Sequence, residues 1–320
     1  MSLGAHVRTL GRGPGRSRSL TQEEARDAMR LMLSGEADPH AVGALLMLMR
    51  MKGETAEEIS GFAAEAQASL PALPRPALDW PCYAAGRTRG LPWFLLSARL
   101  VAAGGHPVLL HGWNGADRAI RDGLGTVGIA VAGSGAEAGA LMARDGIAYL
   151  PLETLSPALF SLLTLRDVLH LRSCINTVCR MLNPGAAPVS VQGVFHPPYR
   201  LLQADAGALL GLEALTVIKG GGGEFERHPC KAIAGFGLRG GAAWETSFPA
   251  LLPEETRRLD DGATDGAMLS ALWDGSLQDP FAEAVVTGTA ALALDTLGVP
   301  EPLDAARALW QARAPIAVSA

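Results

Sequence analysis

The stretch that decides the fold runs Gly43-Ala-Leu-Leu-Met-Leu-Met-Arg-Met-Lys-Gly-Glu-Thr-Ala-Glu-Glu-Ile59. Its first half is apolar on nearly every side, which predicts a helix that is buried or lies in a contact between subunits. Its second half places Thr55 three residues before Glu58, the pattern of a capping box at the start of a helix. The stretch therefore predicts two consecutive helices, the second continuing to about Leu70.

The same helical signals extend toward the N-terminus. Thr21 and Glu24 form a second capping-box pattern, and Gly35 is placed to end the helix that follows. Asp38 before Pro39 is a helix cap followed by proline at the first helical position. The N-terminal region is therefore predicted to be all-helical.

Residues 5–19 differ from these helices because they are rich in Gly, Arg and Ser. The arginines are Arg8, Arg12, Arg16 and Arg18. This composition predicts an extended basic arm or loop. Such an arm is either a mobile terminus or a contact to phosphate, and both interpretations stay open at the level of sequence.

Beyond a proline-rich linker at 71–78, short apolar runs alternate with helical stretches. The runs with strand character are residues 108–110, 128–131, 148–150, 189–194 and 215–218. This alternation predicts a largely parallel α/β sheet. Residues 155–182 break the rhythm with two helical segments in succession.

The composition limits the classes of function. The chain has 320 residues, 48% of them apolar, and a net charge of -5, which suits two domains with large cores. With that charge, nucleic-acid binding requires a local basic patch. The four cysteines are scattered without metal-ligand spacing, so we expect reduced thiols in a cytoplasmic protein. No apolar run is long enough to span a membrane, and the start has no apolar signal core.

Several ordered motifs resemble the anthranilate phosphoribosyltransferases. The segments Leu20-Thr-Gln-Glu-Glu-Ala25 and 43–59 are similar to the N-terminal helical domain of that family. Gly105-His-Pro-Val-Leu-Leu-His-Gly112 resembles its strand leading to a His-Gly-Asn turn. Leu171-Arg-Ser-Cys-Ile-Asn-Thr-Val-Cys-Arg-Met-Leu-Asn-Pro184 is similar to its Arg-Thr-x-Phe-Asn-x-x-Gly-Pro-Leu-x-Asn-Pro segment. The resemblance covers about residues 20–300.

This resemblance implies the fold of glycosyltransferase family 3, in the nucleoside phosphorylase/phosphoribosyltransferase class. In that fold a small all-helical domain is hinged to a larger α/β domain with a mostly parallel central sheet. We expect residues 1–73 with 155–184 to form the helical domain, and residues 78–154 with 185–320 to form the α/β domain. The resemblance also implies a homodimer held by the helical domains.

The phosphate-binding motifs of the family are largely absent. The family holds phosphoribosyl pyrophosphate on a Gly-Thr-Gly-Gly-Asp loop, where glycine lets backbone N–H groups approach the pyrophosphate. Here that loop is Tyr83-Ala-Ala-Gly-Arg-Thr-Arg-Gly90, and the Asn-x-Ser-Thr that follows falls on Pro92-Trp-Phe-Leu95. The family's lysine is Leu110, and the acidic pair that carries magnesium aligns with Gly223-Glu-Phe-Glu226. We therefore expect no anthranilate phosphoribosyltransferase activity.

Cationic side chains and glycines near these motifs are candidates for binding an anion in another form. The strongest stretch is Lys219-Gly-Gly-Gly-Gly-Glu-Phe-Glu-Arg-His-Pro-Cys-Lys231, where four glycines follow a strand and two of the chain's three lysines flank them. A plain glycine turn is the alternative. The candidate anion-binding residues are Arg87, Arg89, His111, Arg172, Lys219, Gly220, Gly221, Gly222, Arg227 and Lys231.

Two of these candidates have a structural alternative. Arg172 matches the family's anthranilate-contacting arginine, and it equally fits an arginine that joins helices or domains. His111 persists with Gly112, where a turn histidine satisfied by the backbone is favoured over an anion ligand.

Two functions from different classes follow from the resemblance. The non-canonical, YbiB-type branch of the family lacks the synthase motifs and binds nucleic acid. The sequence resembles that branch at Gly11-Arg-Gly13, Tyr83-Ala-Ala-Gly-Arg87 and 219–226. This predicts sequence-independent binding of nucleic acid or another polyanion in a basic cleft, with no metal or other cofactor. The alternative is a glycosyl- or phosphoribosyltransferase on an unknown substrate, with altered phosphate recognition and a need for magnesium.

Aromatic residues near the basic cleft are candidates for stacking on bases. These are Tyr83, Trp93 and Trp113. Packing in the core is the favoured role for all three.

Overall fold

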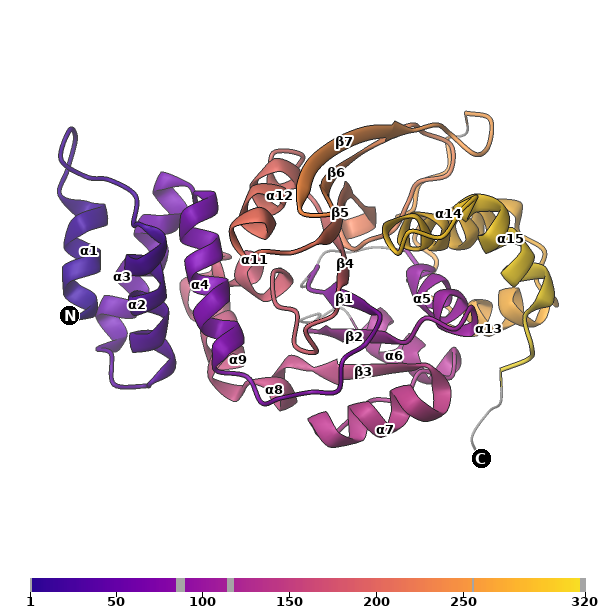
Figure 1. Cartoon of the computed structure of the whole chain (residues 1–320), viewed down its shortest axis with the longest axis horizontal. Coiled ribbons are helices and arrows are strands. Elements are labelled where there is room, and N and C mark those ends of the chain that lie inside the picture. The colour runs from indigo at the N-terminus through magenta and orange to yellow at the C-terminus, as the bar shows by residue number, and fades with distance from the viewer. Residues whose placement is uncertain (1, 85–89, 114–117, 255, 317–320) are drawn as a thin grey trace.

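The chain folds into a small helical part and a larger α/β part. The computed structural model describes residues 2–84, 90–113, 118–254 and 256–316. In Figure 1 the N-terminal helices lie at one end of the molecule, and the sheet with its covering helices fills the rest. This is the fold class that the sequence predicts.

Local capping sets where the N-terminal helices begin. They are α1 (Leu3–Gly11), α2 (Gln22–Leu33), α3 (Pro39–Lys52) and α4 (Ala56–Ala68). Both predicted capping boxes are present: the hydroxyls of Thr21 and Thr55 accept from the backbone N–H of Glu24 and Glu58, whose carboxylates accept from the cap N–H in return. Asp38 caps α3 as predicted. Each such cap stabilises its helix by about 1 kcal/mol.

The prediction of an extended arm over residues 5–19 is wrong for its first half. Residues 3–11 form α1, in which Leu3, His6 and Leu10 are buried against the helical core. His6 Nε2 also lies 2.8 Å from Asp27 Oδ2 on α2. Burial of three side chains at helical spacing stabilises this helix despite the glycines and arginines between them, which the sequence prediction took as signs of an extended arm. In Figure 1, α1 lies at the end of the helical part that is remote from the sheet.

The α/β part is built on one seven-stranded sheet of order β3-β2-β1-β4-β5-β6-β7. The strands are β1 (Leu78–Cys82), β2 (Val108–Gly112), β3 (Ile147–Pro151), β4 (Val189–Val194), β5 (Ala214–Lys219), β6 (Ile233–Arg239) and β7 (Ala242–Phe248). The first five are parallel, while β6 and β7 add an antiparallel hairpin. The carboxyl ends of the parallel strands therefore meet along one edge, where such sheets form their ligand sites.

Two strand expectations differ from the structure. Residues 128–131 form only a single bridge, from Val131 to Tyr149, because Gly128 makes a left-handed turn at the start of the segment. The hairpin β6–β7 was not expected from the sequence. Glycines at Gly235 and Gly237 interrupt the apolar residues of β6, and β7 is largely exposed, so neither strand has the continuous apolar run that reveals the buried strands.

Helices cover both faces of the sheet. One face packs against α5 (Phe94–Ala103), α6 (Ala119–Thr126), α13 (Ala267–Asp274), α14 (Pro280–Thr296) and α15 (Pro302–Ala312). The other face packs against α7 (Gly135–Asp145) and α12 (Tyr199–Leu209). Successive residues alternate between these cores, as Leu110 and Leu109 of β2 do.

Between β3 and β4 the chain returns to the helical part. This segment contains α8 (Leu152–Leu155), α9 (Pro157–Thr164), α10 (Arg166–Leu169) and α11 (Ile175–Arg180). Leu159 and Val178 share a core with Met29 and Phe62 of the N-terminal helices. The return explains the broken alternation at 155–182, while the exact domain boundaries stay a prediction.

The four cysteines are buried thiols: Cys82, Cys174, Cys179 and Cys230. Burial raises the pKa of Cys174 and Cys179 above the usual range of a thiol. They act as core residues at ordinary pH. Within the described part of the chain, no helix is long and apolar enough to cross a membrane.

Candidate anion-binding site

The carboxyl end of β4 separates two pockets that are both lined by cations. The chain leaves β4 at Val194, passes through Phe195 and His196, and enters α12 at Tyr199. Tyr199 lines one pocket and Arg200 lines the other. We name them the arginine pocket and the lysine pocket.

The arginine pocket lies between the helical part and the sheet, with a cavity volume of about 180 Å³. Its polar lining consists of Arg50, Glu54, His170, Arg172, Ser173, Asn176, Thr177, Arg180, His196 and Tyr199. Three arginines thus face one carboxylate. Guanidinium groups recognise carboxylate and phosphate oxygens through paired hydrogen bonds, so the pocket suits an anion.

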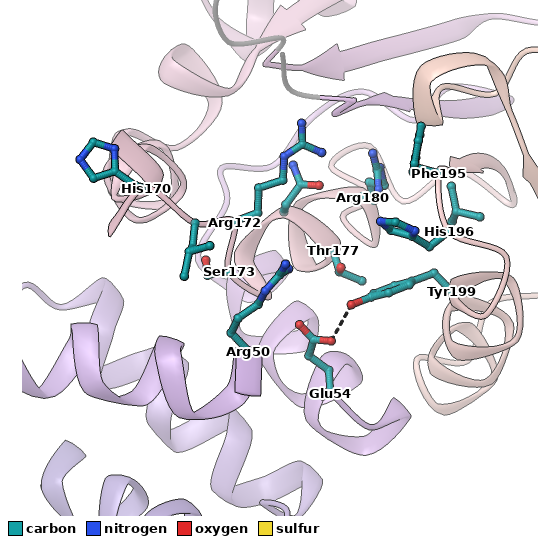
Figure 2. Close-up of a pocket in the computed structure, with 13 residues that line it drawn as sticks. Arg50, Glu54, His170, Arg172, Ser173, Thr177, Arg180, Phe195, His196 and Tyr199 are labelled. Atoms are coloured by element: carbon teal, nitrogen blue, oxygen red, sulfur yellow. Dashed lines mark hydrogen bonds between the residues drawn. The ribbon is translucent and has the colours of Figure 1, made fainter. Parts of the chain in front are cut away.

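Figure 2 shows how these side chains are arranged. Arg50 and Arg172 reach in from one side, while Phe195, His196 and Tyr199 form the opposite wall. The Tyr199 hydroxyl donates to Glu54 Oε2 at 2.8 Å. Burial and the Glu54 carboxylate raise the pKa of Tyr199, so its hydroxyl stays a donor and holds Glu54 in place.

Arg180 joins the arginine pocket to the end of β1. Its Nη2 donates to the backbone carbonyl of Tyr83 at 2.9 Å, and Asn176 Nδ2 donates to the same carbonyl at 3.1 Å. Both donors come from α11, the segment that returns to the helical part. The guanidinium is thereby fixed at the floor of the pocket.

The lysine pocket lies beyond the ends of β5 and β6, with a cavity volume of about 310 Å³. Its lining includes Arg200, Lys219, Gly220, Gly221, His228 and Lys231. Lys219 and Lys231 are exposed, and neither forms an ion pair within the residues described. Two ammonium groups without a carboxylate partner give this pocket a positive potential.

The two pockets are neighbours. A Cβ on Gly223 would lie 3.3 Å from Arg180 Nη2 and 3.4 Å from Phe195 Cβ, so the glycine run passes against the arginine pocket. The cations of both pockets form a single set, which we call the basic line. Its members are Arg50, Arg172, Arg180, Arg200, Lys219 and Lys231.

The structure places five of the predicted site residues in the lysine pocket or the arginine pocket. Lys219, Gly220, Gly221 and Lys231 lie together in the first, and Arg172 lies in the second. Arg87 and Arg89 fall outside the described residues. Whether any of these residues binds an anion stays a prediction.

His111 is a correction to the predicted site, because its side chain is 0% exposed. Its Nδ1 lies 2.9 Å from the Tyr83 hydroxyl, and its Nε2 lies 3.1 Å from Asp79 Oδ1. The second pair is at ion-pair distance but is not aligned as a hydrogen bond. Ser190 donates to the other oxygen of Asp79 at 2.9 Å. The imidazole thus belongs to a buried polar network formed by side chains of β1, β2 and β4, and it does not face a ligand.

Arg227 is a second correction, because only 3% of it is exposed. One Nη donates to the carbonyl of Pro249, and its backbone N–H donates to Thr289 Oγ1 at 2.9 Å. Burial lowers the pKa of the guanidinium to about 10. The side chain supports the chain packed against α14 and does not line either pocket.

The glycine run forms a tight turn, the alternative that the sequence left open, and Gly220 and Gly221 of this turn also line the lysine pocket. Gly221–Gly223 form one 3-10 turn, in which Gly222 has φ +61° and lines neither pocket. A Cβ on Gly220 would lie 1.6 Å from the Glu224 carbonyl oxygen, and one on Gly193 would lie 2.0 Å from the Glu224 carbonyl carbon. The glycines therefore allow the turn to press against the end of the sheet.

The aromatic residues considered for base stacking are mostly unsuited to it. Tyr83 and Trp93 are buried in the cores. Trp113 is partly buried against Phe160, with ring centroids 6.0 Å apart. Core packing, the favoured interpretation, agrees with the burial of the first two.

The helical part matches a known family model. Residues 6–69 match the helical bundle domain of the glycosyl transferase family. Over 225 residues the chain is 28% identical to the anthranilate phosphoribosyltransferase of Mesorhizobium japonicum, an alignment covering 69% of this chain and 66% of that protein. The chain is thus similar in sequence to an anthranilate phosphoribosyltransferase over about two thirds of its length.

Other comparisons show similarity to further proteins in sequence or in fold. Over 212 residues the chain is 31% identical to an uncharacterized protein of Aquifex aeolicus, covering 66% of this chain and 65% of that protein. The alignments thus span just under two thirds of both relatives. The crystal structure of anthranilate phosphoribosyltransferase from Thermus thermophilus has the same fold, with a TM-score of 0.80, 23% identity, and coverage of 97% and 94% of the two chains. The enzyme from Saccharomyces cerevisiae in complex with PRPP and Mg gives 0.77, at 16% identity and 97% and 93% coverage.

Two arginines of the arginine pocket, Arg50 and Arg180, were not among the residues predicted from the sequence. Arg180 stands where the pattern Gly-Pro-Leu has proline, so the departure from the pattern was itself a signal. Arg50 lies in an apolar helix of the N-terminal part, and no local feature indicates that it meets the sheet. Glu54, Phe195 and Tyr199 likewise reach the pocket only through the tertiary fold.

The acidic residues that align with the family's magnesium-carrying pair are used elsewhere in this chain. Glu224 and Glu226 are each 1% exposed. Glu224 Oε1 accepts from the backbone N–H of Ala84 at 2.7 Å, and Glu226 Oε2 accepts from that of Phe94 at 2.9 Å. These carboxylates hold the end of β1 and the start of α5, so they do not fit a magnesium site. In the described residues, no three His, Cys, Asp or Glu side chains are grouped to hold a metal ion.

Proposed function

We propose that this chain binds nucleic acid through its phosphate backbone, along the basic line, and does not make phosphoribosyl anthranilate. The observation that carries the proposal is the charge of the two adjacent pockets. Their lining includes six Arg and Lys residues but a single carboxylate, Glu54, in a chain whose net charge is -5. A local positive surface on an acidic protein is the footprint expected of a polyanion site.

The geometry favours a chain of phosphates over one small anion. The cations extend from α3 through α11 and α12 to the ends of β5 and β6. A single phosphate can contact only one of the two pockets, whereas a nucleic-acid strand places phosphates in both. Contacts of this kind fix the strand without reading its sequence. A homodimer joined through the helical parts would carry two such lines.

The internal use of Glu226 supports the loss of the ancestral substrate. The first N–H groups of a helix form a favourable site for phosphate. At the start of α5 the N–H of Phe94 is already bound by the Glu226 carboxylate. A phosphoribosyl pyrophosphate at this position would meet a buried negative charge, so the transferase alternative requires a different phosphate site.

Binding to a fluorescent single-stranded oligonucleotide across a salt series tests this function. The logarithm of the association constant should fall linearly with the logarithm of salt concentration, with a slope of roughly -2 to -4, because each neutralised phosphate contributes about -0.7 on a single strand. Anisotropy measured between about 50 and 200 mM salt gives this slope. Flat anisotropy with micromolar protein at the lowest salt contradicts nucleic-acid binding.

The same protein sample with magnesium and phosphoribosyl pyrophosphate separates the two candidate functions. A ligand that binds the native state raises the melting temperature. We expect no rise with this ligand. A concentration-dependent rise would favour the transferase alternative and contradict the loss of the phosphoribosyl site.

A further inference from the structure

An exposed aromatic pair lines the arginine pocket next to the end of β4. Phe195 and His196 follow β4 directly, and both are solvent-exposed. Their ring centroids lie 4.9 Å apart at an interplanar angle of 81°, and the His196 and Tyr199 centroids lie 6.5 Å apart. The pair therefore forms a small aromatic surface between the arginine pocket and the entrance to α12 (Figure 2).

The exposure of Phe195 is unusual for its residue type. Phenylalanine is among the residues most often buried. Phe195 is 37% exposed, and it is the aromatic member of the set of exposed large apolar side chains found among the described residues. The other described phenylalanines and tryptophans pack in or against the cores, except Phe236 and Trp244 of the β6–β7 hairpin, whose rings each lie beneath an arginine. A solvent-facing ring beside a row of cations offers a binding surface for a ligand that is both aromatic and anionic.

The backbone around Phe195 is held rather than loose. A Cβ placed on Gly223 would lie only 3.4 Å from Phe195 Cβ, so the glycine turn packs closely against the chain at Phe195. Pro197 and Pro198 follow immediately and restrict the chain before α12 begins. A ring that is positioned in advance loses little conformational freedom when it binds a flat partner.

Resting on the proposed function, we infer that Phe195 and His196 stack on unpaired bases, so that the preferred ligand is single-stranded nucleic acid. The cations on both sides of the pair bind the phosphates that flank the stacked base. Every base has a flat face, so stacking adds affinity without requiring a sequence. In a duplex these faces are covered by neighbouring base pairs, and the rings gain nothing from them.

Phe195→Ala tests the inference by comparing single-stranded and duplex oligonucleotides of equal length at one salt concentration. The wild-type chain should bind the single strand more tightly. The substitution should weaken single-strand binding roughly 10-fold or more, as expected for the loss of one stacked base, and leave duplex binding within about twofold. Phe195→Trp should keep the single-strand preference, while Phe195→Leu, apolar but without a flat ring, should behave as Phe195→Ala does.

The possible outcomes distinguish failure of base stacking by Phe195 from failure of nucleic-acid binding itself. Equal loss for single strand and duplex, or no loss for either, overturns stacking by Phe195 while the basic line still stands. Failure of the wild-type chain to bind either ligand overturns the proposed function, and the inference with it. Thermal melting tests whether each variant is folded. Because the replaced side chain is partly exposed, we expect melting temperatures close to that of the wild-type chain.

Discussion

Changing Arg172, Lys219 and Lys231 together to glutamine lowers the affinity for a single-stranded oligonucleotide roughly 100-fold at about 0.1 M salt. Each of these cations lines one of the two pockets. If each neutralises one phosphate, its loss removes about 0.7 from the salt slope, which is equivalent to roughly fivefold in affinity at this salt concentration. Anisotropy titration of the triple variant and of the wild-type chain measures both quantities.

A second triple variant controls for net charge. Arg26, Arg144 and Arg307 are exposed arginines of α2, α7 and α15, remote in sequence from both pockets. Their replacement by glutamine removes the same charge but no member of the basic line, so affinity should fall less than about threefold. Equal losses in the two variants would show that total charge, and not the basic line, governs binding.

Glu226→Ala lowers the free energy of unfolding by about 2–4 kcal/mol, the largest effect on stability expected from a change at the site. The Glu226 carboxylate is buried and accepts from the Phe94 N–H at the start of α5. Its removal leaves that N–H without an acceptor and opens a cavity where the side chain was. Urea denaturation of the variant measures the loss.

Two companion variants make the Glu226 result specific. Glu226→Gln keeps an oxygen that can accept from Phe94, so it should lose clearly less stability than Glu226→Ala. Glu245 lies on an exposed part of β7, and Glu245→Ala should be nearly neutral. A Glu226→Ala variant as stable as wild type would contradict the role assigned to this carboxylate.

Features that depend on a few neighbouring residues could be predicted from the sequence. The capping boxes at Thr21 and Thr55 are complete within four residues, and the buried strands are recognisable as apolar runs. The helix α1 was missed because its burial depends on packing against α3, which no local pattern among the glycines and arginines reveals. The hairpin β6–β7 was missed for the related reason that a half-exposed edge has no apolar run.

The site likewise contains residues that local sequence predicts and residues that only the tertiary structure reveals. Lys219 and Lys231 flank a glycine run, and two exposed lysines around a turn are brought together by the strands on either side. His111 and Arg227 carry the same types of group, but the fold turns both inward, and the sequence does not show which way a side chain points. Arg50 and Arg180 reach one pocket from helices far apart in the chain, which only the tertiary structure can establish.

In the proposed complex a polyanion lies along the basic line at the carboxyl ends of the strands. Hydrogen–deuterium exchange with and without a single-stranded oligonucleotide can locate this bound strand on the protein backbone. We expect slower exchange in peptides that cover residues 170–180, 195–202 and 219–234, with no change in β7. Protection confined to the backbone of α1 and the turn after it, with none at the strand ends, would show that nucleic acid binds elsewhere than along the basic line.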